Sequence, residues 1–335
     1  MRLWLVDAFA EQVFAGNTAG VVPVDDWLGD DLMQAIAAEN NCSETAFFRP
    51  TGLKGNYELR WFTPTTEVPL CGHATLAAGA VLLSEIEPDL DMAVFDTASG
   101  PLVVRKAIGG FTLDLPKRPR MAWDAPEQLA HALGGVNFVD AFVGEYANVV
   151  LPSEDAVRNL KPDFDAIARL VRGPRAGCLA VTARADEGKP YDFVSRFFAP
   201  GAGLPEDPVT GSSFADLVPY WCDRLGVAEV SGFQASKRGG HVKARQTLSS
   251  VRLTAATAVY LRGEFDPAVT GGVAKLAAPV AEDEDDLLVT LVEDGEEAGE
   301  IHVFELDAPA REESVEIIKV SELPKISSLN FGLQR

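Results

Sequence analysis

One sequence pattern occurs twice in this chain of 335 residues. The first copy, residues 60–76, reads RWFTPTTEVPLCGHATL, and the second, residues 196–214, reads RFFAPGAGLPEDPVTGSSF. Each copy opens with Arg, an aromatic residue, Phe, a small residue and Pro, and then passes through a glycine-containing turn into an apolar helix. Such a duplication predicts two similar halves related by a pseudo-twofold axis, with a cleft between them. We expect the residues that carry out the chemistry at the positions where the two copies differ.

The residues around each copy predict an α+β half built on one apolar helix. The helix expected at 73–86 is apolar nearly all round, which is typical of a helix buried within its domain. Its counterpart is expected at 212–225, and a polar-faced helix at 30–39 would begin with Asp30 as its N-cap. The two halves share a second, shorter similarity: Gly16-Asn17 and Ala147-Asn148 each precede an apolar strand. The fold class expected is α+β, with two pseudo-symmetric halves that each wrap a curved sheet around a central apolar helix.

Three segments are expected along the chain. The first half is assigned to residues 1–118 and the second to 119–265, with a linker in 116–124, where Pro, Lys and Arg are frequent. Residues 266–335 have no earlier counterpart, and their alternating apolar pattern predicts an acidic β-rich C-terminal extension. Two interpretations of this extension are a solvated structural appendage and a regulatory or partner-binding module.

The charge and cysteine content restrict the partners and the compartment. A formal net charge of −21 argues against nucleic acid or an anionic membrane as a partner. Residues 282–335 hold 16 acids and 4 bases and so supply most of this charge. The chain has neither a run of about 18 apolar residues nor a signal-peptide pattern at its start. We expect a cytoplasmic protein with reduced thiols, because the four cysteines match no zinc or disulfide pattern.

Gly72 and Gly211 each stand where a buried helix is expected to begin. A helix N-terminus presents unpaired backbone N–H groups and a partial positive charge. Two such ends facing one cleft would hold the carboxylate of a small substrate, and glycine permits the close backbone approach that this needs. The alternative is two ordinary helix starts, with Thr210 and Ser212 as capping hydroxyls.

Three ionisable residues near the repeats are candidates for proton transfer. Glu44 lies in ENNCSETAFF beside apolar residues, where partial burial would raise its pKa toward a useful value. His73 follows a glycine in an apolar segment, and Asp207 lies between prolines in PEDPVTGSS. Each also has an ordinary interpretation: an exposed loop glutamate, a structural histidine and a turn aspartate.

Cys71 is the residue that would support thiol chemistry, because a thiol at a helix N-terminus has a lowered pKa. Two thiols facing each other across the cleft would form a cofactor-independent racemase or epimerase. The second copy has Thr210 at the matching position, and a threonine is no acid or base at neutral pH. The sequence therefore disfavours a two-thiol mechanism.

These segments resemble the PhzF family of phenazine-biosynthesis-like isomerases. The resemblance runs from Val6 to about Gly240, and its most specific motifs are LCGHAT and EDPVTGSS; the other matching segments are VDAFAEQVFAGNTAGVV, ENNCSETAFF, FDTASGPLVV and QASKRGG. It implies a diaminopimelate-epimerase-like fold with the active site between the halves. It also implies that the enzyme uses neither a cofactor nor a metal, and a homodimer is frequent in the family.

The resemblance further implies roles for particular residues. The family's catalytic glutamate falls on Glu44, its histidine on His73 and its aspartate on Asp207, while its substrate-binding serine falls on Ser212. The implied activity relocates a proton within a small unsaturated or cyclic carboxylate, with Glu44 as general acid and base. Two alternatives stay open: an epimerase or racemase of the same fold, and a non-catalytic protein that binds small molecules.

Overall fold

The computed structural model describes residues 1–173 and 175–266. The C-terminal extension predicted for 266–335 lies outside the described residues, apart from Asp266 at its start. In the described part, no helix combines the length and the apolar character needed to cross a membrane.

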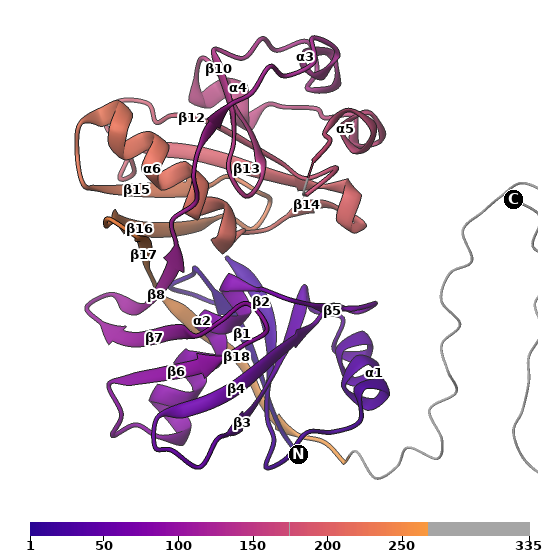
Figure 1. Ribbon diagram of the computed structural model, residues 1–335, viewed down its shortest axis with the longest axis vertical. Helices are drawn as coiled ribbons and strands as arrows, with labels where there is room; N and C mark the ends of the chain where they lie inside the picture. The colour runs from indigo at the N-terminus through magenta and orange to yellow at the C-terminus, as the bar shows by residue number, and fades with distance from the viewer. Residues whose placement is uncertain (174, 267–335) are drawn as a thin grey trace, which may run out of the picture. The chain divides into compact units, whose positions relative to one another are not determined.

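The first half is a curved arrangement of strands around one buried helix, as drawn in Figure 1. Its elements are β1 (Arg2–Ala8), β2 (Asn17–Pro23), α1 (Asp30–Asn40), β3 (Glu44–Pro50), β4 (Asn56–Phe62), β5 (Glu67–Val68), α2 (Gly72–Val81), the π-helical turn η1 (Leu82–Ile86), β6 (Met92–Asp96), β7 (Leu102–Ala107) and β8 (Gly110–Pro116).

The second half repeats this order and contains three short helices, which share an apolar cluster with its strands. Its elements are β9 (Met121–Ala122), α3 (Gln128–Ala132), β10 (Asp140–Val143), β11 (Ala147–Val150), α4 (Glu154–Arg158), α5 (Phe164–Leu170), β12 (Leu179–Arg184), β13 (Phe193–Ala199), the 3₁₀ turn η2 (Pro200–Ala202), β14 (Leu204–Asp207), the 3₁₀ turn η3 (Gly211–Ser213), α6 (Phe214–Leu225), β15 (Glu229–Gln234), β16 (Gly240–Gln246), β17 (Ser250–Ala255) and β18 (Thr257–Glu264).

Strand pairing shows that the repeated motif belongs to a repeated fold. In the first half β2 pairs parallel with β3, β3 antiparallel with β4, and β4 parallel with β6. In the second half β11, β12, β13 and β15 make the same sequence of pairings. The antiparallel pair of β8 and β17 then joins the two halves into one continuous sheet. The expected α+β architecture of two similar halves is therefore confirmed.

One strand from each end of the second half completes a sheet edge. β18 pairs antiparallel with β1 over its whole length, and Figure 1 shows it in orange beside the indigo strands. The short β9 pairs in the same way with β10. Residues 257–264, at the end of the predicted second half, thus hydrogen-bond to the first half. The boundaries at 118/119 and 265/266 stay predictions, since strand pairing alone does not define a domain.

Both central helices are buried, as their composition predicts. All ten residues of α2 are buried, and a Cβ built on Gly79 would lie 2.5 Å from a Val104 methyl carbon, so this glycine permits the close approach to β7. The start of α6 is buried from Phe214 to Cys222. Side chains of both helices belong to the same apolar cluster, which therefore extends across both halves, while each half also has a smaller cluster of its own.

Two local expectations were wrong at helix ends. The N-cap of α1 is Gly29, whose carbonyl oxygen accepts the N–H groups of Leu32 and Met33, whereas Asp30 is already helical and makes no capping hydrogen bond. The helix expected at 73–86 is α-helical only to Val81 and continues as the π-helical η1. Four strands, β5, β9, β14 and β15, and the helix α4 were not predicted from the sequence.

Candidate active site

The two helix starts predicted from the repeat lie against each other. A Cβ built on Gly72 would be 3.5 Å from the Cα of Gly211 and 3.5 Å from the backbone nitrogen of Ser212. The capping alternative is not observed, because neither α2 nor the η3–α6 segment begins with a side-chain capping hydrogen bond. The first N–H groups of a helix have no partner within it. The N–H groups of both helix starts therefore lie close enough together to reach one small bound anion.

Glu44 and His73 meet beside the start of α2. Glu44 is the first residue of β3 and His73 the second residue of α2, and Glu44 Oε2 lies 3.2 Å from His73 Nε2. The two side chains are 19% and 5% exposed, respectively. Within the described residues, neither of these buried atoms has a well-aligned hydrogen-bond partner. The two side chains are shielded from bulk water, and each of these two atoms can still form a hydrogen bond with a further group.

Asn17 connects His73 with Asp207. Its amide nitrogen donates to Asp207 Oδ1 at 2.7 Å and to the carbonyl oxygen of Val209 at 3.0 Å, and it lies 3.4 Å from His73 Nδ1. The oxygens of Asp207 and Val209 accept the two hydrogens of this amide, and the amide nitrogen also contacts the edge of the His73 ring. Asn17 therefore links the start of α2 to the turn that carries Asp207.

Asp207, the last residue of β14, is held by hydrogen bonds to both of its carboxylate oxygens. Oδ1 accepts the Asn17 amide, and Oδ2 accepts the Thr210 hydroxyl. Buried Gln234 fixes the same turn, because its amide donates to the Asp207 carbonyl oxygen at 2.8 Å and its oxygen accepts the Thr210 N–H at 2.9 Å. The carboxylate is thereby fixed at the approach to α6.

Burial sets the protonation states of these groups. Burial raises the pKa of Glu44 to about 8; the nearby charge of Asp207 adds to this shift and a hydrogen bond with Cys71 opposes it. Burial also raises the pKa of Asp207 to about 6, against the hydrogen bonds that it accepts. Burial lowers the pKa of His73 to about 3, so its imidazole is neutral at physiological pH. Two carboxyl groups that titrate near neutrality are suited to proton transfer.

The expectation of a lowered pKa for Cys71 is wrong. Its Sγ lies 3.5 Å from His73 Nδ1, and its thiol is hydrogen-bonded to Glu44. Burial, together with the Glu44 charge, holds the pKa of the Cys71 thiol well above its usual range and outweighs the helix start. The thiol is therefore protonated at neutral pH, the state in which it is a poor nucleophile and a poor base.

Glu44, Cys71 and His73 also supply the donor types of a metal site. Their ligand atoms lie within 4.8 Å of one another, and carboxylate, thiolate and imidazole are all ligands for Zn²⁺. A bound metal would displace the Cys71 proton and would occupy the Glu44 carboxylate. Resident metal binding and proton transfer by Glu44 are therefore competing uses of the same three groups.

All the residues singled out in the sequence meet around the two helix starts, and two others complete the arrangement. Ser212 Oγ lies 2.8 Å from the hydroxyl of Tyr146, which the sequence analysis did not identify. Asn17 was also missed as a site residue, although its repeat partner Asn148 marks the equivalent place at β11. No comparable signal marks Tyr146.

Comparisons with known proteins agree with this architecture. The family model for phenazine biosynthesis-like proteins (PhzC-PhzF) matches residues 6–271. An uncharacterized isomerase of Pseudomonas aeruginosa is 42% identical over 263 residues, which cover 78% of this chain and 98% of the relative. The crystal structure of a PhzF-family protein from Enterococcus faecalis is similar with a TM-score of 0.74 and 39% identity, over 79% of this chain and 98% of the other. A predicted epimerase from P. aeruginosa shares the fold, with a TM-score of 0.61 and 23% identity over 79% and 98% of the two chains.

Proposed function

Because this chain belongs to the family of phenazine biosynthesis-like proteins, we propose that it is an isomerase that moves a proton within a small unsaturated or cyclic carboxylate, with Glu44 as general acid and base. The relatives support an isomerase- or epimerase-type enzyme. One observation carries the finer proposal: the shielded carboxyl group of Glu44, with its pKa raised to about 8, lies beside two adjacent helix starts.

In the proposed reaction, the substrate carboxylate binds the backbone N–H groups around Gly72 and Gly211, supported by Ser212. Ionised Glu44 removes a proton from a carbon of the substrate, and the electron pair of that C–H bond enters the conjugated system. The neutral Glu44 carboxyl then returns the proton to a different atom on the same face. The electron pair forms the new bond to hydrogen, and the Glu44 carboxylate is regenerated, so no proton or electron is gained or lost.

His73 and Asp207 are proposed to support this transfer from two sides. His73 Nε2 lies 3.2 Å from Glu44 Oε2, and the buried, neutral ring holds the acting carboxyl group in place. Asp207 raises the pKa of Glu44 through its own charge, which makes Glu44 a stronger base. Asn17 holds both residues in place, because its amide nitrogen lies 2.7 Å from Asp207 Oδ1 and 3.4 Å from His73 Nδ1.

An epimerase would need a second acid or base on the opposite face of the substrate. Asp207 has a suitable pKa, but both of its carboxylate oxygens already accept hydrogen bonds from Asn17 and Thr210. Thr210, at the position that matches Cys71, donates its hydroxyl to Asp207 and is not a base. These contacts favour an isomerase with one acting carboxyl group. A protein that only binds ligands would not need a glutamate with a raised pKa at this point.

We also propose that the enzyme works without a cofactor, as a cytoplasmic homodimer. Sedimentation velocity on the purified full chain would report the mass in solution, and a monomer at all concentrations would reject the dimer. Activity that is unchanged after exhaustive dialysis against EDTA is expected if no metal takes part.

The test of the proposed function is product identification by NMR, with EDTA present. The substrates are trans-2,3-dihydro-3-hydroxyanthranilate and a panel of small unsaturated carboxylates. An isomerase moves hydrogen between two positions of one molecule, whereas an epimerase inverts a stereocentre and leaves the connectivity unchanged. Binding of several compounds by calorimetry without conversion of any would favour the non-catalytic binding protein.

A further inference from the structure

Tyr146 brings a second hydroxyl group to the start of α6. Its hydroxyl lies 2.8 Å from Ser212 Oγ, and Ser212 adjoins the point where Gly72 and Gly211 meet. Among the described residues, neither oxygen has another hydrogen-bond partner. Two hydroxyls that share one hydrogen bond keep one O–H and several lone pairs for a third group. The pair can therefore donate to or accept from a ligand that is bound at the helix starts.

The phenol remains protonated under ordinary conditions. Burial raises the pKa of Tyr146 above its usual range, although Ser212 and Arg175 act in the opposite direction. The ring packs edge-to-face against Phe197 at a centroid distance of 4.8 Å, and the Arg175 guanidinium lies 5.9 Å from the ring centroid. These contacts fix the ring, so the position of the hydroxyl is determined before a ligand arrives.

Asp216 anchors the loop that carries Tyr146. This residue of α6 is 5% exposed, and its carboxylate accepts the backbone N–H groups of Glu145 and Tyr146 at 2.9 Å each, and the amide of Asn148 at 3.3 Å. The loop passes so close that a Cβ on Gly144 would lie 2.2 Å from Asp216 Oδ1. Because the buried Asp216 carboxylate accepts its hydrogen bonds from this segment, it ties the loop to α6, the helix next to the proposed anion site.

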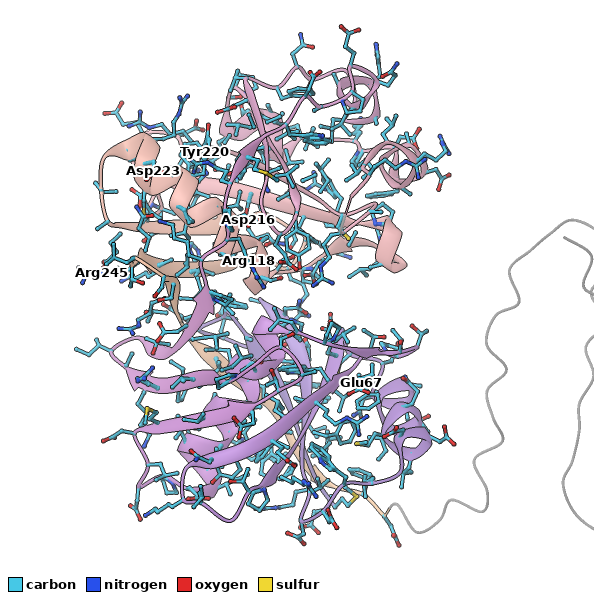
Figure 2. The ribbon with its side chains drawn as sticks, in the orientation of Figure 1. Glu67, Arg118, Asp216, Tyr220, Asp223 and Arg245 are labelled. Atoms are coloured by element: carbon cyan, nitrogen blue, oxygen red, sulfur yellow. The ribbon has the colours of Figure 1, made fainter. Side chains whose placement is uncertain are left out.

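Two arginines hold the outer side of the same loop. Arg175 donates to Glu145 at 2.8 Å, and Arg118 lies 3.3 Å from the other carboxylate oxygen of Glu145. Figure 2 labels Arg118 and Asp216, which lie close together in that view. The loop is thus tied by a carboxylate on its inner side and by cations on its outer side. Such attachment at both sides suits a loop that must keep one side chain in place.

We propose that Tyr146, with Ser212, forms a specificity-determining recognition point for a hydroxyl or carbonyl group on the ring of the substrate, and that Asp216 is its positioning residue. The inference rests on the proposed function, because it places the substrate carboxylate at the two helix starts. It narrows the substrate class to carboxylates that carry a second, neutral polar group. A site built to hydrogen-bond such a group discriminates strongly against analogues that lack it.

The test is calorimetric binding of benzoate and of its 2-, 3- and 4-hydroxy derivatives to the full-length protein. The wild type is expected to bind at least one hydroxybenzoate about tenfold more tightly than benzoate, as one added hydrogen bond would give. In Tyr146→Phe this preference should vanish while the affinity for benzoate is unchanged. Tyr220→Phe is the matched control, because Tyr220 lies on the same helix as Asp216 and its hydroxyl pairs with Asp140.

Asp216→Asn separates positioning from general stability. If Asp216 positions Tyr146, the variant loses the preference for the hydroxybenzoate, and Tyr146→Phe added to it causes no further loss. A merely structural role would lower the thermal midpoint and leave the preference intact. The inference is overturned if the wild type shows no preference, if Tyr146→Phe keeps it, or if none of the four compounds binds. None of these readouts depends on turnover, so the proposed isomerase activity stands or falls separately.

Discussion

Glu44 Oε2 lies 3.2 Å from His73 Nε2, although the two residues come from the first residue of a strand and the second residue of a helix. The histidine is neutral because burial lowers its pKa to about 3, and its Nδ1 faces the Asn17 amide. The carboxyl group of Glu44 beside it has its pKa raised by burial to about 8. Burial thus gives Glu44 a protonation equilibrium near neutral pH, next to an imidazole that carries no charge.

The pH profile should report this equilibrium. If ionised Glu44 is the base, kcat/KM should rise with pH along a limb with an apparent pKa near 8. Asp207→Asn should move that limb to lower pH, because the Asp207 charge raises the pKa of Glu44. Asp31→Asn, at an exposed site on α1, should leave the limb in place. A limb that stays fixed or moves upward in Asp207→Asn would contradict the assignment.

Gly72→Ala should block the anion site without disturbing the fold. The added Cβ would meet Gly211 and Ser212 at ordinary contact distances of 3.5 Å, whereas a Cβ on Gly211 would lie 3.0 Å from the Phe9 ring. The methyl group would project between the two helix starts, so carboxylate affinity should fall at least about tenfold with little change in thermal midpoint. Gly29→Ala is the control, since it caps α1 and has open space around its Cβ position. If Gly72→Ala binds carboxylates as tightly as the wild type, the anion site does not lie between these two helix starts.

Cys71→Ser should retain most of the activity. The thiol is protonated at neutral pH, and losing it should reduce kcat/KM less than about tenfold, against the roughly 10²–10⁴-fold loss typical of a missing acid–base group. Cys222→Ser, a second buried cysteine on α6, controls for the cost of replacing a buried thiol. Complete loss of turnover in a folded Cys71→Ser protein would shift the chemistry from the carboxyl group to the thiol.

Glu44→Gln should stabilise the protein at alkaline pH. The folded-state pKa of Glu44 is raised from 4.5 to about 8, so the folded state holds its proton and wild-type stability is lost as pH rises through this window. The variant cannot ionise, so its advantage in free energy of unfolding should grow from near zero at pH 4 toward an upper bound of about 5 kcal/mol above pH 8. Urea unfolding at several pH values measures it, with Glu39→Gln on the exposed side of α1 as control. An advantage independent of pH would mean that Glu44 is not desolvated.

The duplicated motif predicted the architecture because each copy specifies a local structure. An Arg-aromatic-Phe strand, a turn and an apolar helix need only near neighbours to form, and both helices are buried where expected. The contact between Gly72 and Gly211 follows from the same repeat, since equivalent points on two halves meet at their common axis. The pairing of β18 with β1 of the first half has no such local cause. The two strands are about 250 residues apart in sequence, so their pairing depends on the fold of the whole chain between them.

The contacts that complete the site could not be predicted from local pattern. Asn17 reaches Asp207 across 190 residues, and Tyr146 reaches Ser212 across 66. The protonation of Cys71 was predicted wrongly for a related reason. A helix start lowers a thiol pKa through local dipoles, but burial against Glu44 is a property of the folded chain and acts in the opposite direction.

The most direct test of the account is hydrogen exchange in D₂O, followed by NMR on trans-2,3-dihydro-3-hydroxyanthranilate and the panel of unsaturated carboxylates. Wild type and Glu39→Gln are predicted to incorporate deuterium at a substrate carbon as they isomerise it. Glu44→Gln is predicted to bind the same compound and to incorporate none above the uncatalysed rate. Deuterium incorporation by Glu44→Gln at a rate close to that of the wild type would contradict the account, because another group would then be moving the proton.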